Sequence, residues 1–260
     1  MFKYIGWVIR VIIPLIRYYP MIFRMSNHPE RYPFDVRYNK VRTIALLLLR
    51  ILKVDINMMA APQVKKGTRF YLIGNHVSFL DPVIVVATQK EPITFASKIE
   101  AAKFPIVGRI LRMIDAVFLE RGNLKQEITA MKTMKASMNE GRVNWGLFPE
   151  GTRNQSYNND LLEFKAGSFK LPCVTDTVIL PVAIWGTQTI LTKKIWWKRY
   201  PTYIKYLPII NPKDFDYNTK RIADFSQNLI QTEVNIMKLE YPKLVASLSK
   251  GEDFATKLSK

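Results

Sequence analysis

From Arg69 onward, the sequence alternates short apolar, β-favouring segments with helix-like segments. The strand-like segments are 70–74, 93–97, 116–119, 143–148, 178–185 and 203–209, and the helix-like segments are 82–89, 101–113, 125–139, 165–173 and 220–239. This alternation is typical of a mostly parallel β-sheet covered by helices on both faces. Functional sites in such folds gather beyond the carboxyl ends of the strands. We therefore predict an α/β fold with a site along that edge of the sheet.

The stretch Tyr71–Pro82, YLIGNHVSFLDP, places Asp81 five positions after His76. A general base needs one ring nitrogen free to accept a proton and a partner on the other nitrogen. Five residues is the wrong spacing for neighbours on one helical face, and Pro82 favours a helix start with Asp81 as its N-cap. We therefore expect residues 75–80 to form a loop that folds His76 back towards Asp81. The alternative is that Asp81 only caps its helix and His76 is an ordinary loop residue.

The segment Phe148–Arg153, FPEGTR, directly follows an apolar strand-like segment. Gly151 lets the backbone approach a ligand, while Thr152 and Arg153 offer a hydroxyl and a bidentate donor suited to phosphate. The alternative is a surface turn in which Glu150 and Arg153 pair with each other.

Three further cations are candidates for the same site. Arg121 follows the segment AVFLE and is a second candidate phosphate donor. Lys165 can reach the site from a helix start or be solvated, and Lys98 has the same two interpretations. Because His76, Arg121 and Glu150 each follow a predicted strand, the fold prediction places them on one edge of the sheet.

Four blocks in this order resemble those of the glycerolipid acyltransferase family, which includes the 1-acylglycerol-3-phosphate (lysophosphatidic acid) acyltransferases. The blocks are N-H-x-x-x-x-D with Asn75, His76 and Asp81; KIEAAKFPIVG from Lys98 to Gly108, followed by FLER ending at Arg121; FPEGTR; and VILPVAI, Val178–Ile184. Read without the resemblance, the fourth block is a buried parallel strand.

The resemblance implies roles for the residues of these blocks. His76 and Asp81 would be the catalytic pair. The glycerol phosphate would be bound by Arg121, Glu150, Gly151, Thr152 and Arg153. Asn75, Lys98 and Lys165 are additional candidates, and the fourth block would line the acyl-chain or donor site.

The reaction that the resemblance implies is transfer of a fatty acyl group from acyl-CoA or acyl carrier protein to the sn-2 hydroxyl of 1-acylglycerol 3-phosphate, which gives phosphatidic acid in phospholipid biosynthesis. A related acceptor, glycerol 3-phosphate or another lysophospholipid, is the alternative within this class. We expect no cofactor beyond the thioester co-substrate, and the sequence offers no cluster of metal ligands.

A non-catalytic basic module that binds membrane or nucleic acid is the alternative from a different class. This alternative does not explain why four family blocks occur in order. The sequence also has no zinc-finger spacing and no RNP aromatic block. We therefore expect no nucleic-acid partner. The formal charge of +18 still implies anionic partners, which suits a phospholipid surface or an acidic carrier.

Residues 1–24 carry Lys3, Arg10, Arg17 and Arg24 at seven-residue intervals among mostly apolar residues. In a helix these cations form one stripe, which is the pattern of a helix lying in a membrane interface. Pro14 and Pro20 are expected to kink or divide the helix. A spanning helix is the alternative, although its two central arginines are costly in a bilayer.

A second apolar segment, 41–54, is too short to span a bilayer and follows a connector predicted over residues 26–42. We expect the two helical segments to form a membrane anchor in residues 1–60 and residues 61–260 to form the catalytic domain. The predicted location is the cytoplasmic face of a membrane.

Overall fold

The computed structural model of the protein describes residues 2–249 except 62–63, 66, 121–122, 142, 157–159 and 191–198. Within these residues the strands form one sheet of seven in the order β1-β7-β6-β2-β5-β3-β4. The strands are β1 (Val54–Ala60), β2 (Phe70–Gly74), β3 (Ile93–Lys98), β4 (Val117–Leu119), β5 (Asn144–Leu147), β6 (Val178–Trp185) and β7 (Tyr200–Tyr206). Neighbouring strands are parallel except β6 and β7. The expected mostly parallel sheet is confirmed.

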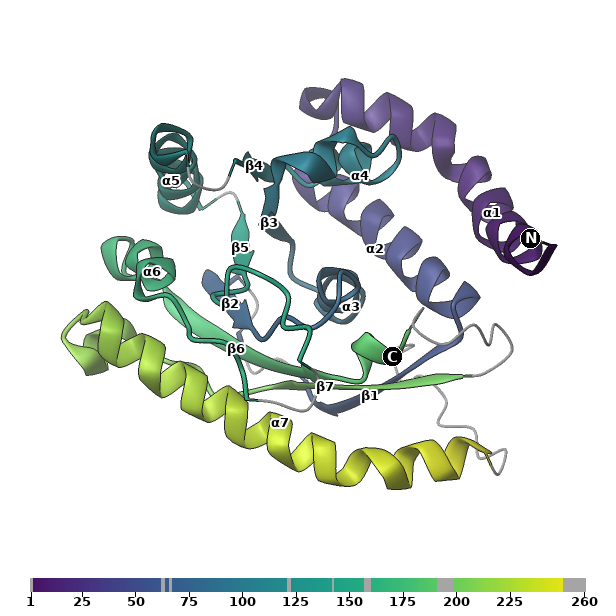
Figure 1. The fold of residues 1–260 in the computed structure, drawn as a ribbon. Coiled ribbons are helices and arrows are strands. Elements are labelled where there is room, and N and C mark those ends of the chain that lie inside the picture. The colour runs from purple at the N-terminus through teal and green to yellow at the C-terminus, as the bar shows by residue number, and fades with distance from the viewer. Residues whose placement is uncertain are drawn as a thin grey trace.

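Helices cover both faces of this sheet (Figure 1). The α-helices are α1 (Phe2–Asn27), α2 (Phe34–Ile51), α3 (Asp81–Thr88), α4 (Val107–Met113), α5 (Leu124–Asn139), α6 (Lys170–Val174) and α7 (Thr219–Ser249). Short 3-10 helices span Pro29–Arg31, Ile99–Lys103, Ala166–Phe169, Thr187–Thr189 and Pro212–Phe215. One hydrophobic core joins α1 to α4 to the sheet, and a second joins α5 to α7 to its opposite face.

The central strand β2 contributes to both cores. Side chains alternate across a strand, so Phe70 and Leu72 pack under α1 to α4 while Tyr71 and Ile73 pack under α5 to α7. All five residues of β2 are buried. This strand therefore gives the loop that follows it a rigid starting point.

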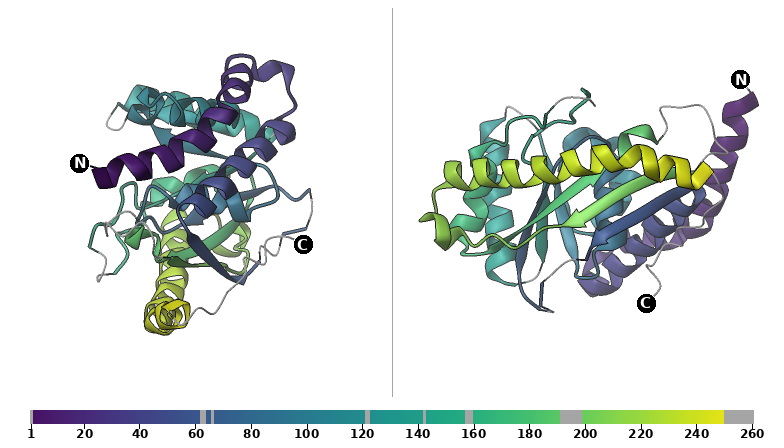
Figure 2. Two further views of the ribbon diagram at one scale, coloured as in Figure 1. Left: turned by 90° about the vertical axis from the view of Figure 1, so that its right-hand side faces the viewer. Right: turned by 90° about the horizontal axis from the view of Figure 1, so that it is seen from below.

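Helix α2 packs into the hydrophobic core of the sheet. Its residues Tyr38 and Val41 are buried in the same core as the sheet. The buried guanidinium of Arg37 donates to both carboxylate oxygens of Asp115, at 2.7 and 2.8 Å, which ties α2 to the turn after α4. The N-terminal end of α1, in contrast, extends past the other elements (Figure 2).

Strand β1 was not predicted. The helix expected over 41–54 begins earlier and ends at Ile51, and residues 54–60 pair in parallel with β7. Lys53 adopts the left-handed conformation, with φ 56°, between helix and strand. The sheet therefore begins at Val54, before the expected boundary after residue 60. The connector expected over 26–42 is also wrong in extent, because α2 starts at Phe34.

Several other elements differ from the prediction. The helix expected over 165–173 is divided into the 3-10 helix Ala166–Phe169 and α6, and α7 runs to Ser249 rather than to residue 239. The helix expected over 101–113 is divided into a 3-10 helix, Ile99–Lys103, and α4, with Pro105 between them. Proline removes a backbone donor and disfavours helical conformation in the residue before it. The last strand covers Tyr200–Tyr206 rather than residues 203–209.

Candidate active site

The loop between β2 and α3 brings His76 against Asp81. His76 Nδ1 lies 2.8 Å from Asp81 Oδ2, so the expected folding of the loop is confirmed. The same oxygen accepts the backbone N–H groups of Val77 and Ser78, at 2.8 and 2.7 Å. Asp81 is fully buried, whereas 17% of the His76 side chain is exposed. A carboxylate on Nδ1 holds the proton there and leaves Nε2 to accept one, which is the arrangement of a general base.

The expected role of Asp81 as an N-cap is wrong. Leu80 is the N-cap of α3, and Asp81 is the first helical residue. Its carboxylate accepts amides of the preceding loop, and Oδ1 accepts the hydroxyl of Thr187 at 2.6 Å. Asp81 therefore orients the histidine and its loop together.

Phe148, immediately after β5, packs flat against His76. Their ring centroids are 4.4 Å apart and their planes differ by 20°. Phe95 of β3 stacks in turn on Phe148, with centroids 6.3 Å apart. Because one face of the imidazole is covered by an aromatic ring, its rotation is restricted.

Glu150 is buried and binds backbone on two sides. Its Oε1 accepts the N–H of His76 at 2.6 Å, and its Oε2 accepts the N–H of Leu162 at 3.1 Å. Burial raises the pKa of this carboxyl to about 7. The surface pair with Arg153 is not formed, and the carboxylate holds the histidine loop. The backbone N–H of Asn154 donates to the carbonyl of His76 at 2.7 Å. Residues of the segment 150–154 therefore bond to both the N–H and the carbonyl of His76.

Two cations lie beside this turn. Gly151 has φ +69°, and a Cβ added there would lie 2.9 Å from Lys165 Nζ. The ammonium of Lys165 therefore covers the backbone of Gly151. Thr152 and Arg153 are exposed. In the described part of the chain, neither the Lys165 nor the Arg153 side chain has a hydrogen bond or ion pair, so both are available to an anion.

Asn75 and Lys98 have other partners among the described residues. Asn75 is buried, and its side-chain amide exchanges two hydrogen bonds of 2.9 Å with the backbone of Ile184, which ties β2 to β6. Lys98 forms an ion pair of 2.8 Å with Glu100, and its described contacts include none with the His76 loop. Arg121 lies outside the described residues.

Comparison with known proteins identifies the family. The family model "Acyltransferase" matches residues 55–185, which is half of the chain. The chain belongs to the acyltransferase family. The expectation of an acyltransferase is confirmed, and the alternative of a non-catalytic basic module is excluded.

Named relatives agree with this assignment. The chain is 28% identical over 205 residues to "1-acyl-sn-glycerol-3-phosphate acyltransferase" of Borreliella burgdorferi, covering 76% of this chain and 79% of the relative. It is 31% identical over 164 residues to a protein of Mycoplasma genitalium named "Probable 1-acyl-sn-glycerol-3-phosphate acyltransferase", covering 61% of this chain and 59% of the relative.

A solved structure shares the fold of this acyltransferase. It is the 1-acyl-sn-glycerophosphate (LPA) acyltransferase PlsC of Thermotoga maritima, with a TM-score of 0.73 and 20% sequence identity. The match covers 90% of this chain and 95% of that one. The likeness supports the α/β architecture.

Three contacts of this candidate site were not predicted. Phe148 lies inside a recognised block, but its packing on His76 depends on the pairing of β2 with β5. The backbone of Asn154 and the hydroxyl of Thr187 reach the site through the fold alone. Thr187 is 106 positions from Asp81, and no local pattern marks it.

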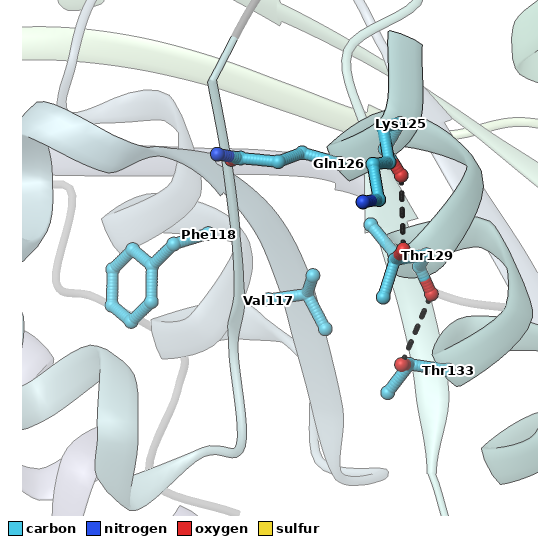
Figure 3. Close-up of a pocket in the computed structure, with 7 residues that line it drawn as sticks. Val117, Phe118, Lys125, Gln126, Thr129 and Thr133 are labelled. Atoms are coloured by element: carbon cyan, nitrogen blue, oxygen red, sulfur yellow. Dashed lines mark hydrogen bonds between the residues drawn. The ribbon is translucent and has the colours of Figure 1, made fainter. Parts of the chain in front are cut away.

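A pocket of about 280 Å³ lies apart from the His76 loop, between β4 and α5 (Figure 3). Its lining residues are Val117, Phe118, Lys125, Gln126, Thr129, Ala130 and Thr133. The hydroxyls of Thr129 and Thr133 are bonded to helix carbonyls of Lys125 and Thr129. None of these residues belongs to the candidate site described above.

Proposed function

We propose that this acyltransferase transfers a fatty acyl group from a thioester to the sn-2 hydroxyl of 1-acylglycerol 3-phosphate, giving phosphatidic acid in phospholipid biosynthesis. The observation that carries the proposal is the partly exposed imidazole held at Nδ1 by a buried carboxylate. The names of the relatives support the acceptor. The proposed reaction needs no cofactor beyond the thioester.

In the proposed mechanism, His76 Nε2 removes the proton of the acceptor hydroxyl as that oxygen attacks the thioester carbonyl. Asp81 stabilises the imidazolium that forms. Collapse of the tetrahedral intermediate breaks the carbon–sulfur bond, and the imidazolium returns its proton to the departing thiolate. A thioester is already activated, so the acyl group passes directly to the acceptor without a covalent enzyme intermediate.

Two cations beside the His76 loop support a phosphate-bearing acceptor. Arg153 belongs to the turn that holds the backbone of His76, and the Lys165 ammonium lies against Gly151 of that turn. Neither side chain has a partner among the described residues. A guanidinium and an ammonium both suit phosphate oxygens. We assign Arg153, Lys165 and Thr152 to the acceptor phosphate, with Arg121 as a predicted further donor.

Acceptor choice tests this proposal directly. We expect the protein in detergent micelles to transfer labelled oleate or palmitate from acyl-CoA or acyl carrier protein to 1-acylglycerol 3-phosphate faster than to glycerol 3-phosphate or to 1-acylglycerophosphocholine. The measurement is product formation with each of the six donor and acceptor pairs. A higher kcat/KM for either other acceptor would assign the enzyme to that substrate instead, and inactivity with all six pairs would contradict the proposed function.

We also propose that the enzyme docks on an anionic membrane surface through α1. Ile16, Tyr19 and Phe23 are large apolar side chains exposed on this helix, and Arg17 and Arg24 beside them are exposed as well. The side chains of Lys3 and Arg10 lie outside the described residues. Among the described helices, none has both the length and the apolar content needed to cross a membrane. Exposed apolar residues interleaved with arginines favour a helix in the lipid interface.

The start of α4 lies close to α1. The guanidinium of Arg109 lies over the ring of Phe23, 4.5 Å from its centroid, so α4 packs directly on α1. Phe104 and Val107 nearby are 61% and 49% exposed. Both belong to the block that begins at Lys98, so the proposed membrane surface adjoins a block of the catalytic domain.

Liposome flotation tests the docking. We expect the wild type to float with vesicles containing phosphatidylglycerol and the triple variant Ile16→Ser, Tyr19→Ser, Phe23→Ser to float at least tenfold less, because it loses the three large apolar side chains that are exposed on the described part of α1. The matched control is Phe225→Ser, Ile236→Ser, Leu239→Ser, which changes three exposed apolar residues of α7. Equal flotation of the two triple variants would contradict docking through α1.

A further inference from the structure

Thr187 occupies a turn whose shape depends on the residue before it. Strand β6 ends at Trp185, and Gly186 adopts the left-handed conformation with φ +102°. A Cβ at Gly186 would lie 2.5 Å from the carbonyl oxygen of Pro201, so only glycine fits there. The side chain of Gln188 accepts the N–H of Gly186 at 2.9 Å and closes the turn. Thr187 is thereby held in the interior, with no exposed surface.

The hydroxyl of Thr187 is directed at the carboxylate that holds His76. Thr187 Oγ1 donates to Asp81 Oδ1 at 2.6 Å, and both side chains are fully buried. The other oxygen, Oδ2, is shared by His76 Nδ1 and the amides of Val77 and Ser78. Within the described part of the chain, Oδ1 accepts a hydrogen bond from Thr187 alone. Burying a carboxylate oxygen without a hydrogen-bond donor costs free energy. The Thr187 hydroxyl therefore stabilises the ionised form of Asp81.

We propose that Thr187 is a positioning residue that fixes the plane and the charge of the Asp81 carboxylate and thereby the orientation of His76. This inference rests on the proposed function only for its kinetic readout. A donor on Oδ1 keeps Oδ2 facing Nδ1, because rotation of the carboxylate would break the Thr187 bond. The Thr187 hydroxyl also draws negative charge towards Oδ1, which weakens the electrostatic attraction between Oδ2 and the imidazole.

The test is the isosteric variant Thr187→Val, which removes the hydroxyl and keeps the shape. We expect kcat for acyl transfer to fall roughly tenfold to a hundredfold, as for loss of a hydrogen bond to a charged group, with KM for the acceptor within about twofold of wild type. The acidic limb of the pH–rate profile moves to higher pH, because a carboxylate with one donor fewer holds a protonated imidazole more tightly. Thr187→Ser keeps the hydroxyl and restores both values.

The matched control is Thr202→Val on β7. Thr202 is also fully buried, and its hydroxyl has no hydrogen-bond partner among the described residues. The same substitution there should leave kcat and the pH–rate profile at the wild-type values. If Thr187→Val fails to fold, Thr187→Ala makes the same test without the γ-branch.

A spectroscopic readout separates this inference from the proposed function. The chain contains two histidines, and a His76→Ala sample assigns the proton NMR signal of His76 Nδ1–H. We expect this signal to move downfield in Thr187→Val and to stay in place in Thr202→Val, whether or not an acyl acceptor is found. A double-mutant cycle adds that Thr187→Val should have little further effect on kcat in Asp81→Asn. An unmoved Nδ1–H signal or a full additional loss in the cycle would overturn the role of Thr187.

Discussion

We expect His76→Ala to lower kcat for acyl transfer by about 10²–10⁴, the usual contribution of a general base. The imidazole is the group that offers a proton acceptor at the exposed side of this loop, and its Nδ1 is already bound to Asp81. The measurement compares saturating rates of labelled acyl transfer to 1-acylglycerol 3-phosphate in micelles. Circular dichroism establishes that the variant is folded.

The second histidine provides a matched control. His28 follows α1, its side chain is 48% exposed, and it lies 3.5 Å from Glu30. His28→Ala should keep the wild-type rate. Asp81→Asn should lose a comparable factor to His76→Ala, because an amide cannot accept from Nδ1 and from two backbone amides while accepting from Thr187. Activity retained in folded His76→Ala would remove the histidine as the base.

We expect the free energy of unfolding to fall by roughly 3 kcal/mol as pH rises from about 4.5 to about 7, through the ionisation of Glu150. Burial raises the pKa of this carboxyl from 4.5 to about 7 in the folded protein. The native state therefore binds the proton more tightly than the unfolded chain. The stability that proton binding by Glu150 contributes is fully present below the pKa of this carboxyl in the unfolded chain. It is lost as pH rises through the pKa in the folded protein.

Urea unfolding at pH 5, 6, 7 and 8 measures this effect. Glu150→Gln cannot ionise, so the variant should lose most of the pH dependence, although one backbone amide then lacks its acceptor. Glu163→Gln is the control, because Glu163 is 82% exposed and its closest cation, Lys220, is 3.5 Å away. That variant should keep the wild-type slope. A slope unchanged in Glu150→Gln would assign the pH dependence to other groups.

Local patterns were sufficient wherever the burial of a segment is uniform or alternates regularly. Residues 70–74 and 178–185 are strands with the predicted bounds. Strands of a sheet covered on both faces are apolar along their whole length, so a short apolar run between turn residues predicts them. The folding of His76 onto Asp81 was also predictable, since it involves a loop of a few residues beside a proline.

Elements that depend on distant partners were not predictable. Residues 54–60, VDINMMA, alternate apolar and polar side chains only over the first four positions, and their strand pairs with the distant β7. The left-handed residue after α2 is Lys53, where a glycine would have marked the helix end in the sequence. The resemblance names Glu150 and Asn75 as site candidates, and the structure adds that both bond to backbone groups far along the chain. Such partners become known only once the strands are placed side by side.

The pairing of β1 with β7 also sets the order in which the chain can fold during synthesis. Val54 lies opposite Tyr200, so the first strand leaves the ribosome long before its partner is made. Contacts between such distant segments form late, because the intervening chain must first be closed into a loop. If α1 docks on lipid as proposed, the nascent chain would be held at the membrane while β1 is still unpaired. The last step of sheet formation would then take place at the lipid surface.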